Sequence, residues 1–355
     1  MAEPITSEEQ LTPEWLTETL RWGGHLTRGR VSRLDLAHSR TLFSHIYRLE
    51  VTYSPDAAPA LPRRLLLKAH FTGDEASAQM GRDEVLAYRV LAEAMTDPPI
   101  VRCFDAAASA DSRGSHLLLE DLSETHQQPE LPVPPSTRHC ELCVEALAEL
   151  HAFWWEHPWL GSKIGELFDE TSLKEIVALN RKALSGFFDY LGDRLSAGRR
   201  RAYEKALAFV PGFWQRRLTA VRRNTLIHGD AHVWNMLHPK DAARGRVYLI
   251  DLATSNRIRP ATNDLAYMMA LQWYPERRAR LEERLLRHYH AALLARGVRN
   301  YSWEDCRLDY RYSVVTHLFT PVLQWSRGQI PATVWWNNLE RISEAYKDLN
   351  CDELV

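Results

Sequence analysis

The stretch HGDAHVWNML, residues 228–237, followed by VYLID, residues 247–251, decides the interpretation of this chain. Asp230 follows a His-Gly pair, Asn235 comes five residues later, and Asp251 ends the next short apolar run. A carboxylate on a rigid loop can accept the proton of a hydroxyl group that attacks a phosphate. Magnesium prefers oxygen ligands, which an Asn/Asp pair supplies. The stretch therefore predicts phosphoryl transfer, with Asp230 as catalytic base and Asn235 and Asp251 as Mg²⁺ ligands.

The order of other residues along the chain supports this interpretation. A single Asp-x4-Asn pair is usually part of an ordinary loop, although it is also the spacing of the protein-kinase catalytic loop. Here Lys68, within the apolar run 63–71, precedes Glu84 in the helical pattern 76–95. Taken singly, each is more simply a surface residue. Together they predict an ion pair that holds the lysine against the α- and β-phosphates of ATP or GTP.

The pattern of apolar residues divides the chain into two parts. Short runs rich in β-branched and aromatic residues, at 43–54, 63–71 and 116–122, predict strands in the first part, together with helices beginning at Thr12 and at residue 76. Long helical patterns follow at 139–156, 171–192, 197–219, 263–273 and over most of 276–348, interrupted by a strand pair at 235–239 and 246–251. The fold class is therefore α+β, and a chain of 355 residues is expected to form two lobes.

At these motifs the sequence resembles the aminoglycoside phosphotransferase and choline kinase-like family of small-molecule kinases. HGDAHVWNML resembles the family's catalytic loop, VYLID its metal-binding strand and NDLAYMMAL, residues 263–271, its Asp-Leu-Ala helix start. LLLEDLSET (117–125), LAELHAFWW (147–155) and YSWEDCRLDYR (301–311) are similar to the ecdysteroid kinase-like branch. The likeness covers most of the chain.

The resemblance implies a bilobal protein-kinase-like fold, in which a small N-terminal lobe with an antiparallel sheet precedes a larger, mainly helical lobe. The implied division is 1–119 for the nucleotide-binding lobe, 120–125 for the hinge and 126–355 for the helical lobe with the catalytic loop and acceptor pocket. By position it also implies an adenine contact at Glu120 and Leu122, and support of the catalytic loop by Asp264. We expect His228 and His232 to support that loop through hydrogen bonds rather than to take part in the chemistry.

Two segments depart from the family pattern. DLAHSRTLFS, residues 35–44, is expected to be the loop before the first strand and lacks the glycines that cradle phosphates in protein kinases, so Ser39 and Ser44 are the expected substitutes. The segment after Asp251, LATSNRIRPATND, replaces a glycine-rich family loop. It is also too short for the peptide platform of a protein kinase, which favours a small-molecule hydroxyl acceptor.

The chemistry of the acceptor pocket stays open between two interpretations. Carboxylates for an aminoglycoside could come from Asp305, Asp309, Asp348, Asp352 and Glu353, although an exposed acidic face explains these residues equally well. The helical part of the chain is also rich in aromatic residues. Core packing explains most of them more simply, but a few could face a ligand. These residues are Trp154, Trp155, Trp234, Trp273, Tyr274, Tyr310, Tyr312, Phe319, Trp325, Trp335 and Trp336. We rank an apolar or mixed alcohol slightly above a polycation.

Composition excludes several other classes of function. The formal net charge is −2 with no long run of one sign, so neither nucleic acid nor an anionic membrane is an expected partner. The acidic N-terminus and the lack of a long apolar stretch predict a cytoplasmic protein. Five cysteines in an odd, irregular set predict reduced thiols, and the Cys140/Cys143 pair falls on a helix rather than in a zinc site. The alternative of another class is a non-catalytic kinase-like nucleotide-binding scaffold, which would be expected to have lost at least one of Lys68, Asp230, Asn235 and Asp251.

Overall fold

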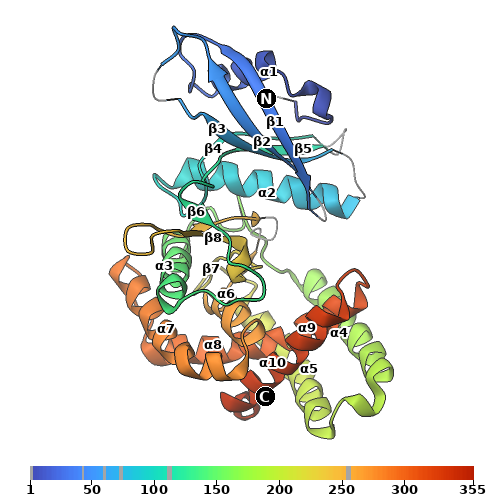
Figure 1. The fold of residues 1–355 in the computed structure, drawn as a ribbon. Coiled ribbons are helices and arrows are strands. Elements are labelled where there is room, and N and C mark those ends of the chain that lie inside the picture. The colour runs from blue at the N-terminus through green and yellow to red at the C-terminus, as the bar shows by residue number, and fades with distance from the viewer. Residues whose placement is uncertain (1–2, 42–43, 59–60, 72–74, 110–113, 253–256) are drawn as a thin grey trace. The chain divides into compact units, whose positions relative to one another are not determined.

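The computed structural model describes residues 3–41, 44–58, 61–71, 75–109, 114–252 and 257–355. Its contacts form two compact units (Figure 1). Unit 1 comprises Met1–Gln128 and Leu237–Ser255, and unit 2 comprises Pro129–Met236 and Asn256–Val355. Among the described helices, none combines the length and apolar character needed to cross a membrane.

Unit 1 is built on an antiparallel five-stranded sheet with the strand order β1-β2-β3-β5-β4. The strands are β1 Val31–Arg40, β2 His45–Tyr53, β3 Arg64–His70, β4 Cys103–Ala108 and β5 Ser115–Glu120. Side chains alternate along β3, so Leu65, Leu67 and Ala69 are buried while Lys68 belongs to the opposite face. The β-branched and apolar runs thus form the strands that their pattern predicts at 43–54, 63–71 and 116–122.

Two helices and a short 3₁₀ turn complete this part of unit 1. Their bounds are η1 Glu8–Gln10, α1 Pro13–Trp22 and α2 Glu75–Ala94. Helix α1 begins as its sequence predicts, because the Thr12 side chain accepts the Trp15 N–H and Pro13 takes the first helical position. Leu16 and Leu20 of α1 join the strands' buried side chains in one core. Helix α2, the long cyan helix in Figure 1, packs against β4 and β5.

The prediction of a loop at 35–44 is wrong for its first six residues. Residues 35–40 belong to β1, which pairs with β2 along its whole length from Val31↔Tyr53 to Arg40↔His45. Only Val31 of β1 is fully buried. The strand is therefore stabilised by backbone pairing at a sheet edge rather than by an apolar run, and its residue pattern gives no sign of it. Strand β4 was not predicted either, because its alanine-rich sequence lacks a strand pattern and the strand is defined by its pairing with β5.

Residues 237–255 cluster with the N-terminal part of the chain rather than with the helices that flank them. This segment contains most of β8, Met236–Pro239, and all of β9, Tyr248–Leu249. Strands β8 and β9 form a three-stranded sheet with β6, His126–Gln127, in the order β6-β8-β9. The expected division at 119 and 125 placed this segment in the helical lobe. Backbone pairing of His126 with Pro239 and of Gln127 with His238 explains why the segment groups with unit 1.

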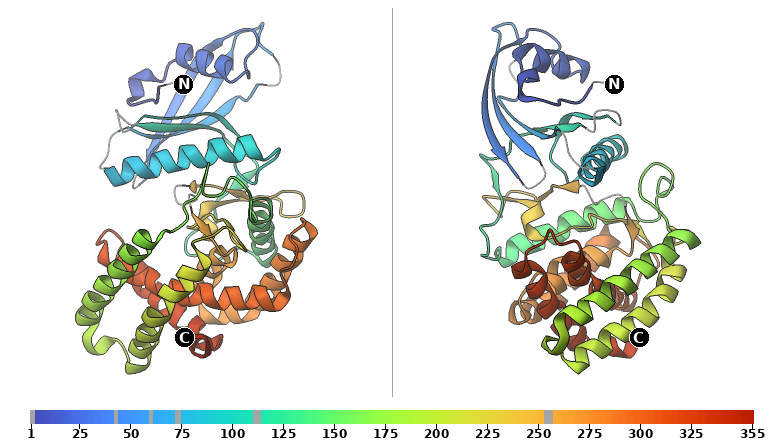
Figure 2. Two further views of the ribbon diagram at one scale, coloured as in Figure 1. Left: turned by 180° about the vertical axis from the view of Figure 1, so that it is seen from behind. Right: turned by 90° about the vertical axis from the view of Figure 1, so that its right-hand side faces the viewer.

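Unit 2 is mainly helical, as Figure 2 shows from two further sides. Its helices are α3 Thr137–Phe153, α4 Glu170–Leu191, η2 Gly192–Arg194, α5 Ala197–Arg217, η3 Val233–Asn235, α6 Thr262–Leu265, the π-helix η5 Ala266–Leu271, α7 Pro275–Ala295, α8 Trp303–His317, α9 Phe319–Ser326, α10 Ala332–Asp348 and η6 Cys351–Leu354. One antiparallel ribbon pairs β7, Thr225–Leu226, with β10, Ile258–Arg259. The five cysteines form no disulfide in the described structure, and Cys140 and Cys143 lie on helix α3 as predicted, where both are buried.

Candidate active site

Lys68 is the centre of a charged cluster in unit 1. Its ammonium nitrogen Nζ lies 2.8 Å from the Glu84 carboxylate and 3.0 Å from Oδ1 of Asp251. Lys68 comes from β3, Glu84 from α2 and Asp251 from the loop after β9. The predicted ion pair between Lys68 and Glu84 is therefore present, and Asp251 adds a second acid to it. That this cluster binds nucleotide phosphates stays a prediction.

Burial and neighbouring charges have opposite effects on the pKa of Lys68. Burial by itself lowers the pKa of the ammonium, but the negative charges of Glu84 and Asp251 outweigh burial and raise that pKa. The lysine is thus held positively charged. Asp251 keeps a 47% exposed side chain and a left-handed backbone with φ 61°, an uncommon conformation for a residue other than glycine. Such strain is frequent where a side chain must point at a ligand.

Ser44, one of the expected phosphate contacts, is 3% exposed and already has a partner. Its hydroxyl lies 2.9 Å from Nε2 of His70, whose Nδ1 lies 3.2 Å from the Ser115 hydroxyl. Gly81 of α2 allows this chain of contacts, because a Cβ there would lie 2.2 Å from the Ser115 hydroxyl oxygen. Ser39 lies within β1, opposite Ile46. A phosphate contact from Ser44 stays a prediction and would require its bond to His70 to rearrange.

The expected adenine contact lies at the end of β5. The Glu120 N–H donates to the Arg102 carbonyl at 2.9 Å, and the Leu122 carbonyl accepts the N–H groups of Thr125 and His126. Within the described part of the chain, the Leu122 N–H has no hydrogen-bond partner. A free backbone donor on the segment after β5 is what recognition of a nucleobase edge would use.

The predicted catalytic loop of unit 2, residues 228–235, is held by its own side chains. Asn235 Nδ2 donates to the backbone oxygen of Asp230 at 3.0 Å and to its Oδ2 at 3.1 Å. The ring nitrogen Nδ1 of His232 accepts the Asn235 N–H at 3.1 Å, and that of His228 accepts the Asp230 N–H at 3.3 Å. Gly229 has φ 82°, which favours glycine. Both histidines thus make hydrogen bonds within the loop.

Asp264 lies beneath this loop and is completely buried. Its carboxylate accepts the N–H groups of His228 at 2.6 Å and Gly229 at 2.9 Å, and lies 3.0 Å from Nε2 of His151. Burial alone would raise the pKa of Asp264, but these partners, His151 first, outweigh burial and hold the pKa below its ordinary value. Tyr289 fixes the ring of His151 at 2.6 Å through Nδ1. Asp264 is thus an ionised anchor for the predicted catalytic loop.

The sequence interpretation missed Tyr267 and His151. Tyr267 lies on the π-helix η5, and burial first, then the neighbouring Asp230 carboxylate, raise its pKa well above the ordinary value. π-Helices often occur at functional sites. The only sequence signal for either residue was its position next to a motif. Tyr267 comes three residues after Asp264, and His151 lies within the segment 147–155 that resembles the family. Which side chains meet the loop depends on contacts distant in sequence.

His317 packs edge-on against the Tyr267 ring and gives unit 2 a pH-dependent stability. Burial lowers its pKa to about 4, from 6.5 for a free ring. Below pH 6.5 the unfolded chain binds a proton that the folded protein excludes, so stability falls as pH falls from about 6.5 towards 4. We expect His317→Gln to remove about 1 kcal/mol of the stability lost between pH 6.5 and 5.5, as measured by urea unfolding. Replacement of the exposed His38 serves as the control. If stability changed with pH equally in wild type and in His317→Gln, His317 would not be the source of the pH dependence.

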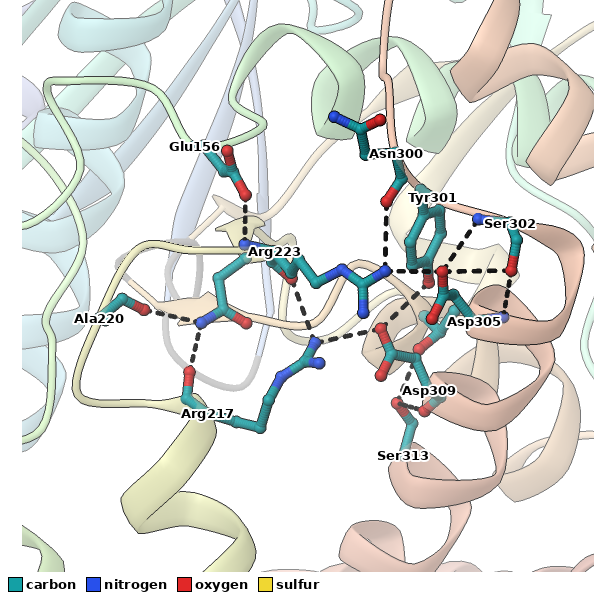
Figure 3. A network of polar contacts seen from close by, with 12 residues as sticks. Glu156, Arg217, Ala220, Arg223, Asn300, Tyr301, Ser302, Asp305, Asp309 and Ser313 are labelled. Carbon is teal, nitrogen blue, oxygen red and sulfur yellow. Dashed lines mark hydrogen bonds and ion pairs between the residues drawn. The ribbon is translucent and has the colours of Figure 1, made fainter.

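The acidic residues considered for the acceptor pocket have basic partners instead. Asp305 pairs with Arg223 at 2.6 Å, and Asp309 pairs with Arg217 at 3.1 Å (Figure 3). The hydroxyl of Tyr301 also donates to Asp309. These pairs tie the segment before β7 to helix α8. The other three acids pair with bases as well: Asp348 with Arg278, Asp352 with Lys205 and Glu353 with Arg311.

Five of the eleven aromatic candidates belong to the core, as their simpler interpretation predicts, and five more are partly buried. Completely or almost completely buried are Trp154, Trp273, Tyr310, Phe319 and Trp335. Tyr274 is the exception, with 62% of its surface exposed.

Comparison with protein families agrees with the motifs in both units. The model of the ecdysteroid kinase-like family matches residues 40–298, well over half of the chain. The chain belongs to the ecdysteroid kinase-like family. It is therefore a kinase-type enzyme that acts on a hydroxyl group. The matched range includes the candidate site residues from Ser44 to Tyr267, but not Ser39.

Solved structures with this fold include several small-molecule phosphotransferases. A candidate aminoglycoside phosphotransferase from Ralstonia eutropha has a TM-score of 0.58 and 15% identity, over 95% of this chain and 98% of that one. The macrolide 2'-phosphotransferase from Brachybacterium faecium has a TM-score of 0.53 and 14% identity, over 92% and 97%. A microcompartment-associated aminopropanol kinase has a TM-score of 0.51 and 14% identity, over 95% of each chain. This chain therefore shares the fold of these phosphotransferases. Comparison with curated proteins gives no match.

Proposed function

We propose that this protein transfers the γ-phosphate of ATP or GTP to a hydroxyl group of a small molecule, with Asp230 as the catalytic base. The observation that carries the proposal is the Asp230 carboxylate, held by the Asn235 amide at 3.1 Å on a loop anchored by buried Asp264. A fixed carboxylate of this kind can align the acceptor hydroxyl and take its proton as the phosphate is transferred. A cytoplasmic location, where ATP and GTP are abundant, agrees with this proposal.

The nucleotide would be bound by residues of unit 1. The positively charged Lys68, oriented by Glu84 at 2.8 Å, supplies the cation that α- and β-phosphates require. The N–H of Leu122, which has no partner among the described residues, supplies a donor for the base. A solved structure with this fold, that of aminoglycoside 2'-phosphotransferase-IIIa, contains GDP. It has a TM-score of 0.50 and is 15% identical to this chain.

Asn235 and Asp251 fit the role of Mg²⁺ ligands. Asn235 uses its Nδ2 for both bonds to Asp230, so its oxygen Oδ1 stays available in the described structure. Asp251 engages Lys68 through Oδ1 and keeps a half-exposed carboxylate. These are the hard oxygen donors that Mg²⁺ prefers, and a bound Mg²⁺ would neutralise charge on the phosphate oxygens. No cluster of three or more His, Cys, Asp or Glu residues suited to a metal occurs among the described residues, which agrees with a metal held mainly by phosphate and water.

Asp251→Ala should separate the metal from the nucleotide. Because Asn235 and Asp251 together supply one negative charge, metal and nucleotide should bind cooperatively. We expect the variant to weaken nucleotide binding tenfold or more with Mg²⁺ present, and about twofold with chelator present, as measured by calorimetry. Asp241→Asn, an exposed acid after β8, is the matched control. Equal loss under both conditions would assign Asp251 a structural role alone.

The acceptor is proposed to be a neutral or apolar alcohol rather than a polycation. An aminoglycoside would require unpaired carboxylates near Asp230, but the five candidate acids of unit 2 pair with arginine or lysine. Only residues 252–263 separate Asp251 from Asp264, too few for the platform on which a protein kinase binds a peptide. By their descriptions, the solved structures named above act on aminoglycosides, macrolides or aminopropanol, so this fold accepts chemically different alcohols.

One screen tests the whole proposal. Release of ADP or GDP is measured with amino alcohols, sugars, sterol-like alcohols, aminoglycosides and a peptide, each in wild type and in Asp230→Asn. We expect acceptor-dependent release with at least one small alcohol and none with the peptide. Nucleotide binding with no transfer to any acceptor class would instead favour the scaffold alternative, and efficient peptide phosphorylation would remove the small-molecule assignment.

A further inference from the structure

Arg259 of unit 2 is a partly buried arginine that has no carboxylate partner among the described residues. Its Nη1 donates to the Ile258 carbonyl at 2.7 Å, and its guanidinium carbon lies 4.4 Å from the centre of the Phe168 ring. In the part of the chain that the structure describes, Arg259 makes no other hydrogen bond. A guanidinium carries its N–H donors in a planar fork. Most donors of this fork are therefore unused.

The surroundings of Arg259 do not neutralise its charge. Burial first, then the nearby charge of Arg257, lower the pKa of Arg259 to about 9, and Glu166 opposes them with a smaller effect. The Phe168 ring stabilises a cation but supplies no negative charge. Charged groups that a protein withdraws from water are normally paired, because an unpaired one destabilises the folded state. A ligand that supplies the missing negative charge would account for this arginine.

Strand pairing fixes the position of Arg259. It lies in β10 opposite Thr225 of β7, and the chain runs from β7 into the predicted catalytic loop at 228–235. Gly165 lets the segment that carries Phe168 approach β10 closely, because a Cβ at Gly165 would lie 2.6 Å from Cγ1 of Ile258. The guanidinium therefore belongs to a rigid ribbon of unit 2 that leads into the loop.

Arg257 connects this ribbon with Asp230. The Arg257 carbonyl accepts the Ile227 N–H at 3.1 Å, so the pairing extends to residue 257. Side chains two residues apart on an extended chain point to the same side, which places Arg257 and Arg259 together. The charge of Arg257 also acts on the pKa of Tyr267, in the direction opposite to that of Asp230. Arg259, Arg257, Tyr267 and Asp230 are thus successive neighbours within unit 2.

From these observations we propose that Arg259 binds an oxyanion of the acceptor, so that the substrate is a hydroxy acid with an apolar body. The acid group binds the unused side of the guanidinium fork, and the hydroxyl lies at Asp230. A planar fork suits this role, because it binds a carboxylate, sulfate or phosphate group through two parallel hydrogen bonds. The Phe168 ring lies beside the apolar part of the ligand.

The inference rests on the proposed phosphoryl transfer and narrows its apolar alcohol to one that carries an acid group away from the hydroxyl. The transfer step itself is unchanged. The hydroxyl oxygen bonds to the γ-phosphorus as the bond to the leaving ADP or GDP breaks, and Asp230 takes the hydroxyl proton. The acid group binds without reacting.

The test compares ω-hydroxy acids of four, six, eight and ten carbons with the diols of the same lengths. Each probe is titrated by calorimetry into the full-length protein without nucleotide. We expect the acid of one length to bind about tenfold more tightly than its diol, because hydrogen bonds to an ionised group are stronger than neutral ones. The preferred length reports the span from Arg259 to Asp230.

Variants of Arg259 assign this preference to the guanidinium. Arg259→Gln should abolish it, and Arg259→Lys should keep part of it, because the charge remains while the fork is lost. Arg307→Gln is the matched control, since it removes the same charge from an exposed position of α8. It should bind the probes as wild type does.

A nucleotide phosphate offers the same oxyanion chemistry and is tested separately. We expect Arg259→Gln to change the affinity for the Mg²⁺–nucleotide complex by less than about twofold, because the residues proposed to bind nucleotide phosphates belong to unit 1. A loss of about tenfold, with acid binding unchanged, would assign Arg259 to the nucleotide and overturn the inference.

Stability of the free protein gives a readout that needs no ligand. Because the charge of Arg259 is unpaired, Arg259→Gln should be at least as stable as wild type in urea unfolding. The best hydroxy acid should stabilise wild type but not the variant. A clear loss of stability in Arg259→Gln would make the arginine structural and overturn the inference.

Two further results would overturn the inference: equal binding of acid and diol at every length, or an acid preference that persists in Arg259→Gln. Failure of the proposed function looks different. Acid binding that depends on Arg259, without release of ADP or GDP, would support the oxyanion site and refute the transfer. Transfer to neutral alcohols at equal rates in wild type and Arg259→Gln would support the transfer and refute the oxyanion site.

Discussion

Asp230→Asn should lower turnover by about a hundredfold or more while nucleotide affinity changes by less than twofold. Asparagine keeps the size of the side chain but cannot accept a proton, and loss of a positioned general base typically has this magnitude. The Asn235 bond to the backbone oxygen of residue 230 does not depend on the carboxylate, so the loop should keep its conformation. Turnover is measured as acceptor-dependent release of ADP or GDP with the best alcohol of the screen.

Asp193→Asn is the matched control for this experiment, because it removes one carboxylate from an exposed site of the same unit. It should retain full turnover. A folded Asp230→Asn protein with near-normal turnover would exclude Asp230 as the base. A parallel loss of nucleotide affinity would instead show that Asp230 contributes to nucleotide binding.

Asp264→Asn should destabilise the protein by about 3 kcal/mol and also reduce turnover. The buried carboxylate has partners in His228, Gly229 and His151, and hydrogen bonds to a charged group contribute about 1.5–3 kcal/mol each. An asparagine can retain some of these bonds through its oxygen, but its NH₂ group must face another donor. Unfolding in urea, followed by circular dichroism, measures the loss of stability.

A surface acid provides the comparison for Asp264→Asn. Asp352 pairs with Lys205 at 2.9 Å, but its side chain is 64% exposed, so Asp352→Asn should leave stability almost unchanged. If Asp264→Asn were equally mild, Asp264 would not anchor the catalytic loop. If its stability fell but turnover stayed normal, the loop would be held by its internal bonds alone.

Local sequence patterns were sufficient for much of the fold and for the core of the site. Helices α3, α4 and α5 lie where apolar spacing predicts them, because the side that a helix buries repeats along the chain itself. Asp230 and Asn235 are close for the same kind of reason, being five residues apart on one tight loop. The pair of Lys68 and Glu84 was predicted from chemistry and order, because a lysine in an apolar strand requires a nearby acid.

Tertiary structure alone decided the features that join distant parts of the chain. Strand β1 exists through its pairing with β2, and its own residues carry almost no apolar signal. His151 reaches Asp264 across 113 residues, and Arg217 neutralises Asp309 across 92, so neither partner can be read from its neighbours in sequence.

The acidic residues at 305–353 show this limit most clearly. Their composition allowed both a cationic pocket and an exposed face, and only the tertiary structure shows that Arg217, Arg223, Lys205, Arg278 and Arg311 pair with these acids. The physical reason is that a motif specifies the chemistry a residue can perform. Long-range packing determines which charges are neutralised and which remain available to a ligand.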